Sequence, residues 1–128
     1  DTNIDNGALE FAIGSHKWDL SPPSENFHAP NNYKKELHNY VNQNDKTLQI
    51  ASVNIPAGGV SFHHGLTWHG SGVNKSNRDR RAVVAHCVPN NAKFHPTNCG
   101  GTGPIYRKYK LNESDELDDN FFPLLWKK

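Results

Sequence analysis

Short β-rich runs closed by glycine or proline constrain this chain more than any other feature. The longest runs are residues 8–13, 47–55 and 80–88, and two shorter runs, 60–63 and 66–69, lie between them. A run of roughly four to eight β-branched or aromatic residues between turn-forming residues is typical of a strand. The pattern predicts a mainly β fold of the sandwich, barrel or jelly-roll kind.

Two segments fall outside this pattern. Residues 19–46 are polar and rich in Pro and Asn, and we expect a long connection there with a turn of helix near residues 34–40. A connection of that length in a compact domain is often functional, for example as a loop that faces the substrate. Residues 121–126 are apolar, and we expect them to pack against the rest of the protein.

The hydrophobic content of the chain bears on whether it forms a complete domain. Hydrophobic residues make up 34% of the 128 residues, whereas globular domains usually contain about 45–50% apolar residues when glycine is counted. The chain is therefore either a small loop-rich domain or a part of a larger one. We favour the second interpretation, in which further strands lie elsewhere.

The net charge and the cysteine content limit the kinds of partner and the cellular compartment that we expect. The formal net charge is +1, which gives no reason to expect a nucleic acid or an anionic membrane as partner. No apolar run is long enough to span a membrane, and the first residues do not resemble a signal peptide. The two cysteines, Cys87 and Cys99, could form one bridge. Free thiols in a cytoplasmic protein are our expectation.

Histidine is concentrated in one short segment. Of eight histidines, His63, His64 and His69 fall within seven positions. Imidazole is the commonest protein ligand for metals, and histidine with a carboxylate and open coordination positions is typical of non-haem Fe(II) oxygenases. A single histidine is more often a hydrogen-bonded structural residue, so the cluster alone does not define a site.

The segment from His69 to Arg80 is predicted to be a β-hairpin that turns between Asn74 and Lys75. That register places Arg80 opposite His69, and the period of two in a strand places Ser71 on the face of His69. A metal-type ligand, a hydroxyl and a guanidinium on one face would suit a chelating acid whose far carboxylate accepts paired hydrogen bonds from arginine.

A solvated charge cluster at the start of a strand is the other interpretation of the arginines. We assign Arg78, Asp79 and Arg81 to such a cluster, and Arg80 to the site.

Three motifs resemble the phytanoyl-CoA dioxygenase family. The pattern His-Gly-Ser-Gly-x-Asn-x-Ser-x-x-x-Arg at 69–80 resembles its distal signature. Asn-Gly-Ala-Leu at 6–9, followed by Gly-Ser-His at 14–16, resembles its middle motif. Gly-Pro-Ile-Tyr at 103–106 and the segment 122–126 are similar to the tails of many members. The resemblance therefore runs from residue 6 to the C-terminus in family order.

The resemblance implies a double-stranded β-helix, or jelly roll, that uses Fe(II) and 2-oxoglutarate. His69 matches the distal iron-binding histidine of the family. Arg80 matches the arginine that pairs with the far carboxylate of 2-oxoglutarate, and Ser71 matches a hydroxyl that assists it. His64 occupies a position that is often histidine in relatives, but we do not expect it to be a ligand. Residues 14–16 are expected to be a structural turn.

One departure from the family concerns the other two ligands. The family supplies them as a His-x-Asp pair upstream of Asn-Gly-Ala-Leu, and this chain contains no His-x-Asp. We therefore expect residues 1–128 to be the C-terminal portion of one jelly-roll domain, with the pair before residue 1. Alone, the chain would hold one of the three expected ligands, bind iron poorly and be inactive.

Several functions stay open at this point. The resemblance favours hydroxylation of a C–H bond in a small molecule, with O₂ as co-substrate. A small residue in place of the upstream aspartate would instead indicate a halogenase. A non-catalytic jelly-roll binding module that has lost the iron site is the alternative from another class. A zinc hydrolase using the three clustered histidines is disfavoured, because adjacent strand residues face opposite sides. The substrate is not indicated.

Overall fold

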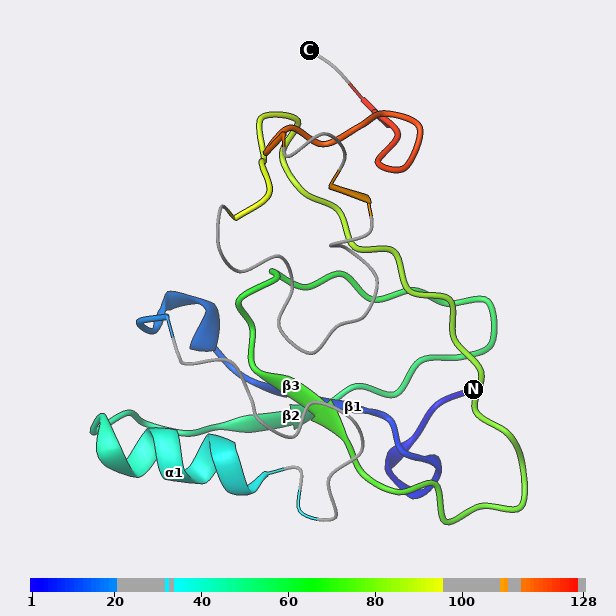
Figure 1. Cartoon of the computed structure of the whole chain (residues 1–128). Helices are drawn as coiled ribbons and strands as arrows, with labels where there is room; N and C mark the ends of the chain where they lie inside the picture. The colour runs from blue at the N-terminus through cyan, green and yellow to red at the C-terminus, as the bar shows by residue number, and fades with distance from the viewer. Residues whose placement is uncertain (21–31, 33, 96–108, 111–113, 127–128) are drawn as a thin grey trace. The chain divides into compact units, whose positions relative to one another are not determined.

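The structure is a computed structural model that describes residues 1–20, 32, 34–95, 109–110 and 114–126. Two compact units are present, Asp1–Val84 and Ala85–Lys128. In the described part of the chain, the named helices and strands all lie in the first unit (Figure 1).

The first unit is built on a three-stranded antiparallel sheet. Strand β1 is Leu9–Ala12, β2 is Ile50–Ser52 and β3 is His69–Ser71. The strand order is β2-β1-β3, so β1 is central and the predicted strand over residues 8–13 is confirmed. An antiparallel sheet with little helix agrees with the predicted mainly β class.

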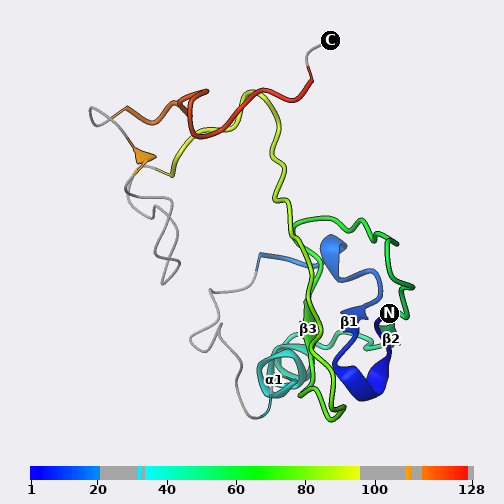
Figure 2. The ribbon, with the colours of Figure 1, turned by 90° about the vertical axis from the view of Figure 1, so that its right-hand side faces the viewer.

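The two faces of the sheet have different environments. Side chains alternate along a strand, and Glu10 and Ala12 on one face are buried. Helix α1, Lys35–Gln43, packs on that face through Leu37 and Val41, which form a core cluster with Ala12. Figure 2 shows α1 end-on beside the sheet. The opposite face has no covering helix among the described residues.

Helix α1 confirms the helix expected near residues 34–40. Its two buried residues, Leu37 and Val41, are four positions apart and therefore lie on one side of the helix. Residues 21–31 of the predicted long connection lie outside the described residues.

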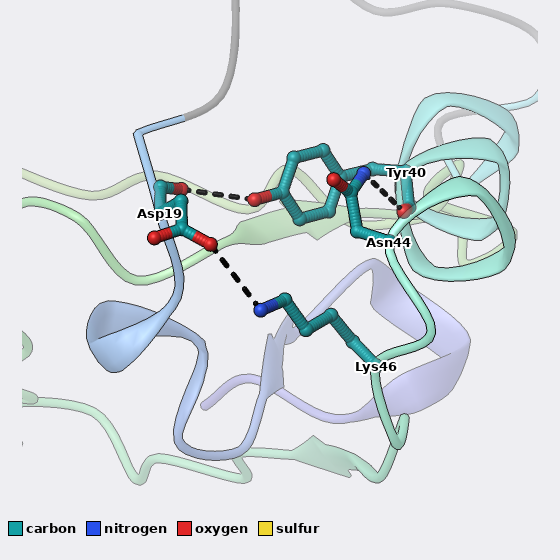
Figure 3. A network of polar contacts seen from close by, with 4 residues as sticks. All are labelled: Asp19, Tyr40, Asn44 and Lys46. Atoms are coloured by element: carbon teal, nitrogen blue, oxygen red, sulfur yellow. Dashed lines mark hydrogen bonds and ion pairs between the residues drawn. The ribbon is translucent and has the colours of Figure 1, made fainter.

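A polar network holds the end of α1 to the segment that follows β1 (Figure 3). The Tyr40 hydroxyl donates to the Asp19 carbonyl at 3.0 Å, and Lys46 Nζ lies 3.3 Å from Asp19 Oδ2. The Asn44 amide donates to the Tyr40 carbonyl at 2.8 Å. The Tyr40 ring also packs against Trp18 and Trp68, with centroid distances of 5.9 and 5.3 Å. Tyr40 therefore links α1 to two segments that flank the sheet: the one that follows β1 and the one that precedes β3.

Tyr40→Phe is expected to lower the free energy of unfolding by about 0.5–1.5 kcal/mol, because it removes one hydrogen bond and keeps the ring. Tyr40→Ala is expected to cost clearly more, since both ring contacts are lost. Urea unfolding of the two variants measures the difference. Equal costs for Phe and Ala would contradict a packing role for the ring.

Gly7 is fixed by its backbone and by a close neighbour. The 3-10 helix η1, Ile4–Asn6, is capped at its start by the Asn3 side chain and ends at Gly7, whose φ is +79°. A Cβ at Gly7 would lie 2.8 Å from the Gly72 carbonyl oxygen, just beyond β3. The Asn-Gly pair of the sequence therefore seats η1 against the end of β3.

Gly7→Ala is expected to destabilise the first unit by roughly 1–3 kcal/mol, because it adds left-handed strain and a collision. Gly58→Ala is the matched control, since Gly58 has a φ of +81° and its Cβ would meet nothing within 4 Å. Both variants carry the cost of a left-handed conformation, and only Gly7→Ala also carries the cost of the contact with Gly72. Thermal unfolding of both variants therefore separates the two costs. If the two substitutions cost the same, the contact with Gly72 is unimportant.

Four predicted strands differ from the structure. The described residues 60–63 and 80–88 contain no strand, so those predictions are wrong, and the predicted strand at 66–69 begins only at His69. A strand needs a neighbour to receive its N–H and C=O groups. Residues 81–90 are all exposed, and Val83 is 101% exposed, so the described residues provide no such neighbour for this run. The predicted strand at 47–55 shortens to β2, with one isolated bridge at Ile55.

The second unit centres on aromatic side chains. Phe94 is buried, and its ring meets Phe122 edge-on at 5.5 Å, while Tyr109 lies 4.7 Å from Phe121. Of the segment 121–126, which was expected to pack down, Phe122 is partly buried, whereas Phe121 and residues 124–126 are exposed.

Lys93 and Cys87 of the second unit are exposed. A hydrogen bond to Glu116, together with the charge of that carboxylate, raises the pKa of the exposed Lys93 ammonium. The Cys87 thiol is free and exposed. Cys99 and the tail motif at 103–106 lie outside the described residues.

Candidate metal and co-substrate site

His69 is the first residue of β3 and lies on the sheet face opposite α1. The register pairs it with Phe11 of β1, and the two ring centroids are 5.9 Å apart. The His63 ring lies 4.6 Å from His69 and 4.9 Å from Phe11. Ser71 follows two positions later in β3 and therefore shares the face of His69, as the period of two predicts.

A hydrogen bond to a backbone carbonyl indicates which ring nitrogen of His69 carries a hydrogen. Its Nδ1 lies 2.7 Å from the carbonyl oxygen of Thr67. A carbonyl only accepts hydrogen bonds, so Nδ1 donates its hydrogen, and in the neutral ring Nε2 then carries the free lone pair. Metal-binding histidines usually donate their other ring nitrogen to a carbonyl or carboxylate in this way. The ring is exposed.

The predicted hairpin pairing of His69 with Arg80 is wrong. Strand β3 pairs with β1, and no strand is present in the described residues 72–84. The chain does turn near the expected place, but it bends at residues 76–78 rather than at 74–75. Asn74 Oδ1 accepts from the Ser76 backbone N–H, and the Asn74 amide donates to the Arg78 carbonyl at 2.7 Å. These side-chain hydrogen bonds compete with the strand ladder and hold the turn open.

The turn is also tied to η1, because the Lys75 N–H donates to the Asp5 carbonyl at 2.8 Å. Arg80 follows this turn and is partly buried. Arg81 forms a 2.8 Å ion pair with Asp79, and both side chains are more than three-quarters exposed. That pair agrees with the solvated charge cluster predicted for these two residues.

His63 and His64 face different partners. His63 lies against His69, whereas the His64 ring lies 5.7 Å from that of His16. The described residues contain no group of three His, Cys, Asp or Glu side chains that could hold a metal ion. They therefore do not assemble the three-histidine zinc site. For iron, His69 fits as one ligand, and the described residues do not complete the set.

A small hollow beside β3 is lined by Glu10, Lys34, Trp68 and His69, among others. Lys34 Nζ forms a 2.9 Å ion pair with Glu10, whose side chain is only 10% exposed. A hollow bordered by a paired charge is unsuited to a purely apolar ligand. The ion pair instead fastens the start of α1 to the central strand.

Ser15 is a buried residue near His69 that sequence reasoning did not single out. The sequence predicts only a structural turn at residues 14–16, whereas Ser15 is 2% exposed and its Oγ accepts from the Trp68 N–H at 2.9 Å. That contact lies one residue before His69. The only signal in the sequence is a serine placed directly after the turn glycine, Gly14.

Comparison with known proteins identifies the class. A family model described as phytanoyl-CoA dioxygenase matches residues 1–82, which is more than half of the chain. The matched segment contains β1, β3 and the residues His69, Ser71 and Arg80. The chain belongs to the phytanoyl-CoA dioxygenase family, as its motifs indicated. No curated protein and no solved structure matches it. No helix in the described residues is long and apolar enough to cross a membrane.

Proposed function

We propose that this chain is part of an Fe(II)- and 2-oxoglutarate-dependent dioxygenase that hydroxylates a C–H bond of a small molecule. Membership of the family supports an oxygenase in general terms. The observation that carries the proposal is the hydrogen bond from His69 Nδ1 to the Thr67 carbonyl, which leaves Nε2 as a metal donor within the matched segment.

Each residue has a distinct role in this proposal. His69 Nε2 binds the metal. The guanidinium of Arg80 pairs with the far carboxylate of 2-oxoglutarate, and the Ser71 hydroxyl, on the face of His69, assists that pairing. When bound, iron and 2-oxoglutarate together activate O₂ for insertion of an oxygen atom into the substrate. The protein positions these groups and keeps one metal position open.

The proposal extends to the rest of the domain. A jelly roll with residues 1–128 as its C-terminal portion would take the remaining His-x-Asp ligands from sequence upstream of Asp1. Aspartate in that pair would make the protein a hydroxylase, and glycine or alanine there a halogenase. Family membership favours a small-molecule substrate, and the nearly neutral charge gives no reason to expect a nucleic acid.

A non-catalytic binding module is the second candidate. It is favoured by one observation, namely that the described residues supply no complete group of metal ligands. Such a module would keep the sheet and the arginine while lacking metal-dependent turnover.

The deciding experiment measures succinate formation from 2-oxoglutarate by the full-length natural protein. Removal of metal with a chelator is expected to abolish succinate formation, and Fe(II) is expected to restore it, whereas Zn(II) is not, because zinc has no redox chemistry. Uncoupled turnover without the organic substrate is sufficient for the assay. A full-length protein that binds no Fe(II) and forms no succinate would be the binding module.

A further inference from the structure

One peptide group lies between the site histidine and the buried serine. The carbonyl of Thr67 accepts from His69 Nδ1 at 2.7 Å. The N–H of Trp68, which belongs to the same peptide unit, donates to Ser15 Oγ at 2.9 Å. A peptide unit is planar and rigid, so it cannot rotate at one end without disturbing the hydrogen bond at the other.

Ser15 is itself anchored to the central strand. Its hydroxyl donates to the Ala12 carbonyl at 2.7 Å, which leaves the oxygen lone pairs to accept from Trp68. The Ala12 N–H donates in turn to the Trp68 carbonyl at 2.9 Å. Both backbone groups of Trp68 are therefore fixed by the end of β1, and Ser15 is 2% exposed.

The hydrogen bonds form a directed series. His69 donates to the Thr67 carbonyl, the Trp68 N–H donates to Ser15, and Ser15 donates to Ala12. Donors that point the same way polarise one another and strengthen each bond in the series. A stronger acceptor at the Thr67 carbonyl favours the His69 tautomer with hydrogen on Nδ1.

We propose that Ser15 is a positioning residue that sets the tautomer and ring orientation of His69 through the Thr67–Trp68 peptide group. Its bearing on metal binding rests on the proposed function, in which His69 Nε2 is a ligand. Residues that orient a ligand from outside the coordination sphere typically change metal affinity by about 10- to 100-fold when they are replaced.

A purely structural role is the competing explanation, because Ser15 also closes the turn after β1. The two roles differ in one observable. Loss of stability alone leaves the tautomer of His69 unchanged, whereas loss of the hydrogen-bond series redistributes the ring hydrogen between Nδ1 and Nε2.

The test is the ring-nitrogen NMR spectrum of His69 in the metal-free, full-length protein, recorded in alkaline buffer where imidazole is neutral. Assignment comes from the signals that disappear in His69→Gln. The natural protein is expected to show the Nδ1–H tautomer. Ser15→Ala is expected to give a mixture of tautomers, and Ser15→Thr, which retains the hydroxyl, is expected to restore the original spectrum.

Val41→Ala is the matched control. Val41 is 8% exposed and belongs to the core cluster that includes Ala12, but no hydrogen bond of the series involves its side chain. It is expected to destabilise the sheet and leave the tautomer unchanged. A mixture of tautomers in Val41→Ala would show that general loosening is responsible, and would overturn the proposal.

The same variants give a second readout in Fe(II) affinity, measured by equilibrium binding. Ser15→Ala is expected to weaken binding about 10- to 100-fold, and Ser15→Thr much less. If Ser15→Ala does not fold, Ser15→Cys supplies a weaker acceptor of similar size and is expected to give an intermediate tautomer ratio. An unchanged tautomer in whichever of the two variants folds would overturn the proposal. If His69→Ala retains iron, the proposed function fails, while the tautomer result stands on its own.

Discussion

His69→Ala is expected to abolish succinate formation by the full-length protein, both with substrate and in uncoupled turnover. The substitution removes the Nε2 donor that the hydrogen bond to Thr67 leaves available. A site reduced from three protein ligands to two is expected to hold iron far less tightly. The measurements are the iron content of the purified variant and its rate of succinate formation.

His64→Ala is the control for this experiment. The His64 ring lies beside that of His16, and its Nδ1 accepts from the Leu66 N–H at 3.1 Å, so these contacts involve residues other than the proposed ligand. Iron content and turnover are expected to stay close to those of the natural protein. His69→Ala with unchanged iron content and turnover would exclude His69 as a ligand.

Arg80→Ala is expected to raise the concentration of 2-oxoglutarate needed for half-maximal turnover by roughly 10- to 150-fold. A charge-assisted hydrogen bond contributes about 1.5–3 kcal/mol, and about 1.4 kcal/mol corresponds to a tenfold change. Arg80→Lys is expected to recover only part of this, since an ammonium cannot present two parallel donors. Iron binding is expected to be nearly unchanged. Titration of succinate formation with 2-oxoglutarate measures all of these effects.

Arg81→Ala is the matched control for Arg80. Arg81 is adjacent in sequence, and its guanidinium already pairs with Asp79 at the surface. Exposed ion pairs contribute about 0–1 kcal/mol, so little change is expected. Small and equal effects at the two arginines would assign both to a solvated basic cluster, and the co-substrate role of Arg80 would be withdrawn.

Composition and periodicity in the sequence predicted β1 and α1. The run at 8–13 became β1 because it is central and pairs on both sides. The helix near 34–40 formed because Leu37 and Val41 share one side of it. The run at 80–88 has an equally strong strand composition, but composition supplies no partner, and no strand formed there. Composition predicts a strand correctly only where the fold also supplies a neighbouring strand, as β2 and β3 do for β1.

In the candidate site, too, the sequence predicted only the features that follow from a local pattern. The shared face of His69 and Ser71 follows from strand period alone and was predictable. The pairing of His69 with Arg80 required a turn at residues 74–75, whereas the chain bends at residues 76–78 and the Asn74 side chain forms hydrogen bonds there. The link from Ser15 to Trp68 joins residues 53 positions apart, so no local pattern could reveal it.

The peptide group between Thr67 and Trp68 predicts which residues homologous proteins carry at the positions around it. Its contribution to the hydrogen-bond series comes from backbone atoms alone, which every residue except proline supplies in full. Substitution of the Thr67 side chain therefore leaves these two bonds available. Across homologues, a serine or threonine at position 15 should accompany histidine at 69, with varied residues at 67. Proline at 68 should be absent from that group, because it lacks the N–H that reaches Ser15.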